Sequence, residues 1–231
     1  MLLSYYIPNV LEAGCDEAGR GPLAGSVFAA AVVWDSERAE RLPALERLND
    51  SKQMTARERY ALREVMEQEA RAWAVAEVTP QEIDEINILN AALLAMRRAL
   101  AQLQPQPEHI IVDGNKWKPY IPEGGLMEIP AQTIVKGDGK YLSIAAASVL
   151  AKTYRDDYML RLHEEYPQYH WDTNMGYPTH EHYAAIAQYG ITPYHRKSFR
   201  LIRNEELGIE GIHSAAKLSN RKLSNSQISY D

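Results

Sequence analysis

The sequence predicts a mixed α/β fold, at the border with α+β, in which one sheet is flanked by helices. Two features of the strand order lead to this prediction. The early apolar segments follow short, direct connections, which suit antiparallel pairing. The later short strands alternate with helical segments, and helical crossovers suit parallel pairing. We therefore expect about five strands in a mixed sheet.

Size and composition limit what the chain can be. With 231 residues and 45% hydrophobic content it can bury a large core, so we expect one large domain, with or without an appendage. The net charge of −6 gives no overall positive field, so any nucleic-acid surface must be local. Cys15 is the only cysteine, which excludes an intrachain disulfide and a cysteine zinc cluster.

The start of the chain has no basic segment followed by an apolar one, and no apolar run approaches the ~20 residues that span a bilayer. We therefore expect a cytoplasmic protein with no membrane partner, and we expect it to be a monomer.

The first half of the chain alternates strand and helix signals. Apolar residues flank a glycine-rich stretch, with Val10 and Leu11 before it and the buried-strand pattern 27–33 after it. Thr55 and Glu58 form a capping-box pattern that starts a helix, and 72–78 predicts a third strand.

A second capping box, Thr79 to Glu82, has Pro80 at the first helical position. It predicts a helical stretch to Leu103 with a break near Asn87. The segment Gln104-Pro105-Gln106-Pro107 ends this stretch.

Two short strands follow. Residues 109–115 predict a buried strand that carries Asp113 at its carboxyl end, and 132–135 predict the last strand. Between them, 116–130 contain three prolines and two adjacent glycines, which indicates a surface excursion. Residues 136–140 are typical of a tight polar turn.

The C-terminal part is helical. An alanine-rich helix is predicted over 142–165, and Thr179 caps a further helix that ends at Gly190. We assign the first domain to residues 1–203 and predict that 204–231, which are polar and serine-rich, form a mobile tail.

Acidic residues come from three separate places at strand ends or turns: Asp16 with Glu17, Asp113, and Asp138. Gathered at one sheet edge, four carboxylates would repel one another, and two Mg²⁺ or Mn²⁺ ions would remove that conflict and create a site for phosphodiester hydrolysis. The alternative is that they are ordinary turn acids, since Asp-Gly dipeptides are common in turns.

The acidic stretch, Asp16 to Gly25, resembles the opening signature of the ribonuclease HII family, the type 2 ribonuclease H enzymes. Further segments resemble that family's motifs in the same order: Asn49-Asp50-Ser51-Lys52, Asp113-Gly114-Asn115, Lys136-Gly137-Asp138, Ser143 to Lys152, Met175 to Thr179 with His182, and His195 to Phe199. One departure is a longer segment, 115–133, before the fourth acid.

The resemblance implies a ribonuclease H-like fold and an endoribonuclease. It implies that Asp16, Glu17, Asp113 and Asp138 bind two divalent ions and catalyse hydrolysis, which leaves a 3′-hydroxyl and a 5′-phosphate. The implied substrates are RNA–DNA hybrids and duplex DNA with single embedded ribonucleotides, cut 5′ of the ribonucleotide.

Substrate recognition also has a basis in the residues. Gly19 and Gly21 flank Arg20, so a ligand can approach the backbone there without meeting a Cβ. A ribose 2′-hydroxyl is the group that distinguishes RNA from DNA. The resemblance implies that this Gly-Arg-Gly backbone recognises the 2′-hydroxyl while Tyr177 stacks on the sugar. Without the resemblance, we would interpret Tyr177 as a half-buried aromatic residue in a loop.

Phosphate contacts require a local basic patch. We assign Lys52, Lys152 and Arg196 to substrate binding. The wider set of candidate basic residues is Lys52, Lys136, Lys152, Arg155, Arg196, Lys197 and Arg200. We interpret Cys15 as a small core residue and assign no chemistry to any histidine.

Other functions stay open. A ribonuclease HIII-like enzyme carries an additional N-terminal domain, whereas the first motif here begins at Gly14. A junction resolvase of the same fold, a non-catalytic RNA–DNA hybrid-binding protein and a small-molecule Mg²⁺ phosphatase are the remaining alternatives. The tail is also a candidate contact for a sliding-clamp partner.

Overall fold

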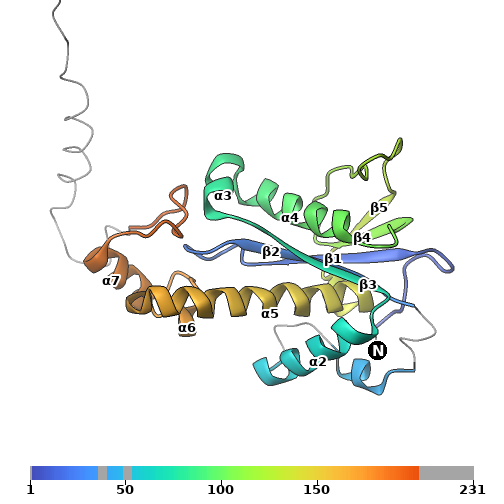
Figure 1. Cartoon of the computed structure of the whole chain (residues 1–231), viewed down its shortest axis with the longest axis horizontal. Helices are drawn as coiled ribbons and strands as arrows, with labels where there is room; N and C mark the ends of the chain where they lie inside the picture. The colour runs from blue at the N-terminus through green and yellow to red at the C-terminus, as the bar shows by residue number, and fades with distance from the viewer. Residues whose placement is uncertain (1, 36–40, 49–53, 203–231) are drawn as a thin grey trace, which may run out of the picture.

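A computed structural model describes residues 2–35, 41–48 and 54–202 of the chain (Figure 1). Its centre is a five-stranded sheet, and the strands are β1 (Glu12–Ala18), β2 (Val27–Val33), β3 (Ala72–Val78), β4 (His109–Asp113) and β5 (Ala131–Ile134). The order across the sheet is β3-β2-β1-β4-β5. The pairs β1–β2 and β2–β3 are antiparallel, whereas β1–β4 and β4–β5 are parallel, so the sheet is mixed, as predicted.

Helices cover both faces of the sheet. One face packs against α3 (Pro80–Ile86) and α4 (Ile88–Gln102), and the other against α2 (Ala56–Glu69) and α5 (Leu142–Glu165) (Figure 1). Shorter segments and the last helix complete the described chain: η1 (Pro43–Arg47), η3 (Gly137–Gly139), η4 (Pro167–Tyr169), α6 (Trp171–Asn174) and α7 (His180–Tyr189).

The local helix signals are confirmed. Thr55 and Thr79 accept hydrogen bonds from the Glu58 and Glu82 amides, and both glutamates bond back to the cap residue. Asn87 has a positive φ of 66° and separates α3 from α4. The last strand begins one residue earlier than predicted and ends at Ile134, so Val135 is exposed.

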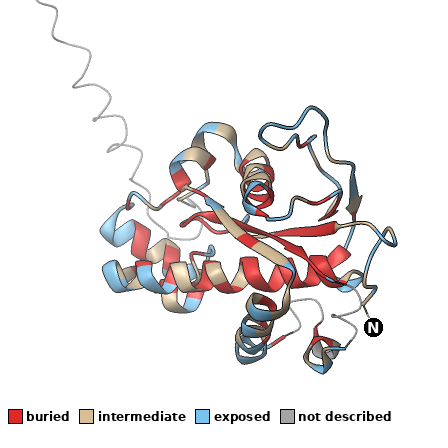
Figure 2. Cartoon of the chain, turned by 45° about the vertical axis from the view of Figure 1, so that its right-hand side comes forward, coloured by how far each residue is buried: buried red, intermediate tan, exposed pale blue. Residues whose placement is uncertain are grey.

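The alanine-rich helix predicted over 142–165 is confirmed as α5, and its first part is buried all round. From Leu142 to Ala151 every residue is buried (Figure 2), because the sheet lies on one side and α2 on the other. Gly14 of β1 allows this close approach: a Cβ there would lie 2.4 Å from the backbone nitrogen of Ile144. The alanines of α5 therefore serve as small contact residues rather than as one apolar stripe.

A third cluster joins the C-terminal helices to the domain. Trp171 and Tyr169 stack with ring centroids 5.1 Å apart, and His182 and His195 pack edge-on or tilted against them. The His182 Nδ1–H donates to the Tyr177 carbonyl, and its Nε2 accepts from the Trp171 indole at 3.1 Å. The expected helical C-terminal part is thus a packed extension of the domain.

Some expectations fall outside the described residues. These are Lys52 with the rest of Asn49 to Lys52, the boundary at residue 203, and the 204–231 tail. Within the described ranges, no helix has both the length and the apolar character needed to cross a membrane.

The buried histidine pair predicts a pH dependence of folding. Burial, followed by the neighbouring His182, lowers the pKa of His195 to about 4. The unfolded chain, in which histidine titrates near ~6.5, therefore binds this proton first. The free energy of unfolding should fall as the pH drops from about 6.5 toward 4, by up to ~1.4 kcal/mol per pH unit.

Urea unfolding at pH 7.5, 6.5 and 5.5 measures this slope. His195→Asn keeps an acceptor near the Thr192 amide but cannot take up the proton, so its slope should be flatter than that of the wild type. Equal slopes for the two proteins would contradict the assignment.

Candidate active site

Three parallel strands bring the acidic residues to one edge of the sheet. β1, β4 and β5 run in the same direction, so their carboxyl ends lie together. The register pairs Cys15 with Val112, which places Asp16 beside Asp113 at the next position. Asp16 and Glu17 lie within the last part of β1 rather than in a turn after it.

Asp16 is the buried centre of this group, with 6% of its surface exposed. Its Oδ1 accepts from the Glu17 amide at 2.7 Å, and the Ser148 hydroxyl of α5 donates to the same carboxylate. Burial, and then the negative charges of Glu17 and Asp113, raise the pKa of Asp16 well above its ordinary value. A positive partner at this position would reverse that effect.

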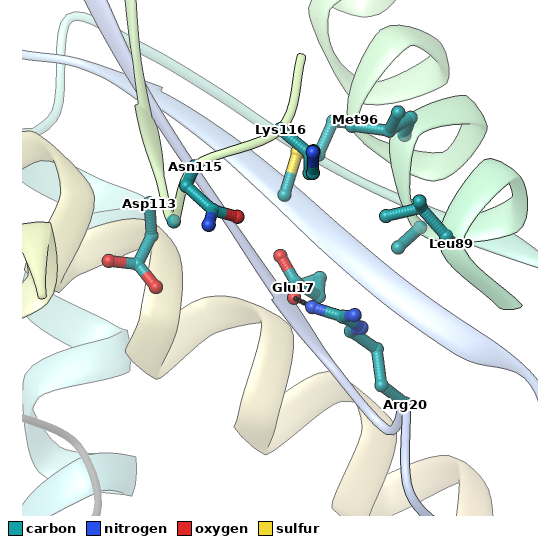
Figure 3. Close-up of a pocket in the computed structure, with 10 residues that line it drawn as sticks. Glu17, Arg20, Leu89, Met96, Asp113, Asn115 and Lys116 are labelled. Atoms are coloured by element: carbon teal, nitrogen blue, oxygen red, sulfur yellow. Dashed lines mark hydrogen bonds and ion pairs between the residues drawn. The ribbon is translucent and has the colours of Figure 1, made fainter. Parts of the chain in front are cut away.

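Glu17 points to the opposite face of the sheet from Asp16 because side chains alternate along a strand. It forms an ion pair with Arg20 at 3.2 Å, beside a small cavity of about 90 Å³ under α4 (Figure 3). The Asp113 carboxylate is turned away from that pair (Figure 3), and its Oδ1 accepts from the Gly137 amide at 2.7 Å.

Asp138 lies in the turn that follows β5. It is buried, and its Oδ1 accepts from the Gly139 amide at 3.0 Å. The same turn holds Asp113 through Gly137, where a Cβ would press on Ile144 of α5 at 2.6 Å. Asp138 does not line the cleft that the other three acids share, but its neighbour Gly137 donates a hydrogen bond to Asp113.

A cleft of about 460 Å³ opens at this edge, on the side of α5. Its lining includes Asp16, Glu17, Gly19, Arg20, Gly21, Arg59, Asp113, Ser148, Lys152 and Tyr177. Three of the four predicted acids thus meet the predicted Gly-Arg-Gly segment and Tyr177. Within 2–35, 41–48 and 54–202, no three His, Cys, Asp or Glu side chains are grouped closely enough, as they lie, to hold a metal ion.

Tyr177 stands at the mouth of the cleft and is 42% exposed. A Cβ on Gly21 would lie 3.5 Å from its ring, so the ring covers the Gly-Arg-Gly loop. The preceding Gly176 has a φ of +78°, and a Cβ there would meet the Ala24 carbonyl at 2.7 Å, so only glycine fits this close crossing.

Two arginines predicted as surface phosphate contacts are buried instead. Arg196 is 0% exposed and donates to the carbonyls of Gly19, Arg20 and Gly25. Arg155 is 1% exposed and donates to the carbonyls of Ser26, Ala24 and Met175. Both guanidinium groups donate to backbone carbonyls and are buried, so neither side chain is presented at the surface of the cleft.

The remaining basic candidates divide into two groups. Lys152 lines the cleft and pairs with Asp156 at 2.6 Å. The other described candidates, Lys136, Lys197 and Arg200, are exposed and do not line it.

Arg59, in the first turn of α2, also lines the cleft, and sequence reasoning missed it. Its Nη1 donates to the Met54 carbonyl at 2.5 Å, which turns the side chain back over the start of the helix. The capping box that fixes this helix start was the only local signal, and it does not specify a role for Arg59.

Known proteins resemble this chain over most of its length. Residues 13–202 match the family model described as Ribonuclease HII. The chain is 59% identical over 209 residues to a ribonuclease HII of Bacteroides thetaiotaomicron, covering 90% of this chain and 99% of that one. It is 60% identical over 202 residues to a ribonuclease HII of Phocaeicola vulgatus, covering 87% and 95%.

Solved structures agree in fold. Ribonuclease H2 of Pyrococcus horikoshii superimposes with a TM-score of 0.69 at 30% identity, covering 93% of this chain and 99% of that one. A PCNA:RNase HII complex of Archaeoglobus fulgidus gives 0.64 at 26% identity, covering 86% and 98%. The five-stranded mixed sheet is thus a ribonuclease H-like fold, and the chain belongs to the ribonuclease HII family of metal-dependent endoribonucleases.

Proposed function

We propose that this protein cuts the RNA strand of RNA–DNA hybrids and nicks duplex DNA 5′ of single embedded ribonucleotides. The observation that supports this most is the meeting of Asp16, Glu17 and Asp113 with the Gly19–Gly21 loop and Tyr177 in one cleft. The acids suit phosphodiester hydrolysis, and the loop and the aromatic ring suit recognition of a sugar. A protein that only binds nucleic acid gains nothing from carboxylates beside phosphate.

The chemistry of the acids fits two Mg²⁺ or Mn²⁺ ions, since hard divalent cations prefer oxygen ligands. Asp16 is buried beside two other carboxylates, an arrangement that raises its pKa and that positive charge would relieve. We propose Asp16, Glu17, Asp113 and Asp138 as the ligands. When bound, such ions supply activation of the attacking water and stabilisation of the leaving 3′ oxygen.

The chain's own residues position the nucleic acid. We propose that the Gly19, Arg20 and Gly21 backbone contacts the ribonucleotide, where the two glycines leave the approach free of Cβ atoms. Tyr177, half-exposed beside Gly21, provides a flat surface for the sugar. Lys152 and Arg59, which both line the same cleft, provide positive charge for phosphates.

We propose that the protein acts as a monomer. A structural relative was solved bound to PCNA. We propose that this chain likewise contacts a sliding clamp, with the 204–231 segment as the contact.

The proposed substrate predicts a defined product. Purified protein with Mg²⁺ should nick a duplex that carries one ribonucleotide, immediately 5′ of it, and leave a 3′-hydroxyl and a 5′-phosphate. The all-DNA duplex of the same sequence and an all-DNA four-way junction should stay intact. Junction cleavage would favour the resolvase alternative, and an uncut ribonucleotide duplex would contradict the proposal.

Asp16→Asn should abolish cleavage but preserve much of the duplex binding, because phosphate contacts supply that binding. Without metal the variant should unfold at the same or a higher urea concentration than the wild type, since a carboxylate beside two others is removed. Mg²⁺ should raise the melting temperature of the wild type and have less effect on the variant.

Asp172→Asn is the matched control, since it removes one carboxylate that pairs with His163 and does not line the cleft. It should keep both cleavage and the Mg²⁺-induced shift. Cleavage by Asp16→Asn at the wild-type rate would exclude Asp16 from the mechanism.

A further inference from the structure

Arg196 connects the last described segment of the chain to the Gly-Arg-Gly loop. Its Nη2 donates to the Gly19 carbonyl at 2.6 Å and its Nη1 to the Arg20 carbonyl at 3.1 Å. Its Nε donates to the Gly25 carbonyl at 2.9 Å, which closes the base of the loop. The side chain is fully buried, so these carbonyls have replaced water around the guanidinium.

Two consecutive peptide units are oriented by these bonds. In a trans peptide the C=O and the N–H point in opposite directions. Because the Gly19 and Arg20 carbonyls both point at Arg196, the amides of Arg20 and Gly21 point away from it. In the described part of the chain, no residue accepts a hydrogen bond from either amide. Both residues line the cleft.

The backbone conformation that orients these two peptide units requires glycine at position 19. Its φ is +92°, and a Cβ there would lie 2.1 Å from Nε of the buried Arg155. Successive backbone amides that face one side form a concave donor site for an oxygen ligand. The loop therefore presents a pair of donors beside Asp16 and Tyr177, with its rear side fixed by a buried cation.

We propose that Arg196 is a positioning residue that holds the Arg20 and Gly21 amides as a donor pair for an oxygen acceptor of the bound nucleic acid. The proposal rests on the proposed function, since it names what the loop contributes to that site. The acceptor is either the ribose 2′-oxygen or a neighbouring phosphate oxygen.

Arginine is suited to this task in a way that lysine is not. The planar guanidinium presents several N–H groups in a rigid fork and can serve two neighbouring carbonyls and a third at once. A lysine ammonium is a single point charge on a flexible stem. Arg196→Lys therefore keeps the charge but releases at least one of the two peptide units.

Fluorescence anisotropy with Ca²⁺ in place of Mg²⁺ tests the proposal on two duplexes, one with a single ribonucleotide and one all-DNA. Affinities are expressed per active protein from stoichiometric titration. Arg196→Lys should weaken binding of the ribonucleotide duplex by about 5- to 20-fold, the loss expected for one or two well-placed hydrogen bonds.

Arg63→Lys is the matched control. Arg63 also makes several contacts, with Glu67, Asp157 and the Tyr154 ring, but these lie between α2 and α5. It should lower thermal stability and leave both affinities unchanged.

The pattern of losses identifies the acceptor. A loss confined to the ribonucleotide duplex supports the 2′-oxygen, and an equal loss on both duplexes supports a phosphate oxygen. Unchanged affinities in Arg196→Lys, or the same losses in Arg63→Lys, would overturn the proposal. A wild-type protein that binds both duplexes equally would contradict the proposed function. In that case, comparing the affinities of the wild type and Arg196→Lys for the all-DNA duplex still tests the amide pair.

Discussion

The concentration of carboxylates at one edge of the sheet is the constraint on which the site depends. The parallel register of β1 and β4 places Asp16 beside Asp113, and the chain adds Glu17 next to Asp16. Such a group is costly to bury, and hydrogen bonds from the Ser148 hydroxyl and the Glu17 amide to Asp16 offset part of that cost. We propose that the remaining excess of negative charge attracts divalent cations to this edge.

A second constraint keeps the Gly19–Gly21 loop in place beside those acids. The loop after β1 is bonded to the C-terminal part of the chain through its backbone: Leu23 donates to Gly176, Gly25 to Tyr194, and the Arg196 amide to Leu23. Buried Arg155 and Arg196 add side-chain bonds to the same loop. The C-terminal helices therefore serve the site by fixing the loop and Tyr177, although they contribute no acid.

Much of this could be predicted from the sequence, because the signals are local. The strands 27–33 and 72–78, both capping boxes and the break at Asn87 depend on neighbouring residues, and the structure confirms them. The tertiary arrangement is harder to predict from the sequence. Nothing local distinguishes a buried arginine from an exposed one, so Arg196 was assigned to phosphate contact and Arg59 was missed. The all-round burial of the first half of α5 likewise depends on what packs against it.

We propose that Asp16, Glu17 and Asp113 form one site for divalent cations. A crystal structure with Mn²⁺, analysed by anomalous scattering, tests it most directly. We expect anomalous density for Mn²⁺ at the carboxyl edge of β1 and β4, with the ion coordinated by Asp16 together with Asp113 or Glu17. Ordered Mn²⁺ elsewhere, with this edge empty at saturating metal, would contradict it.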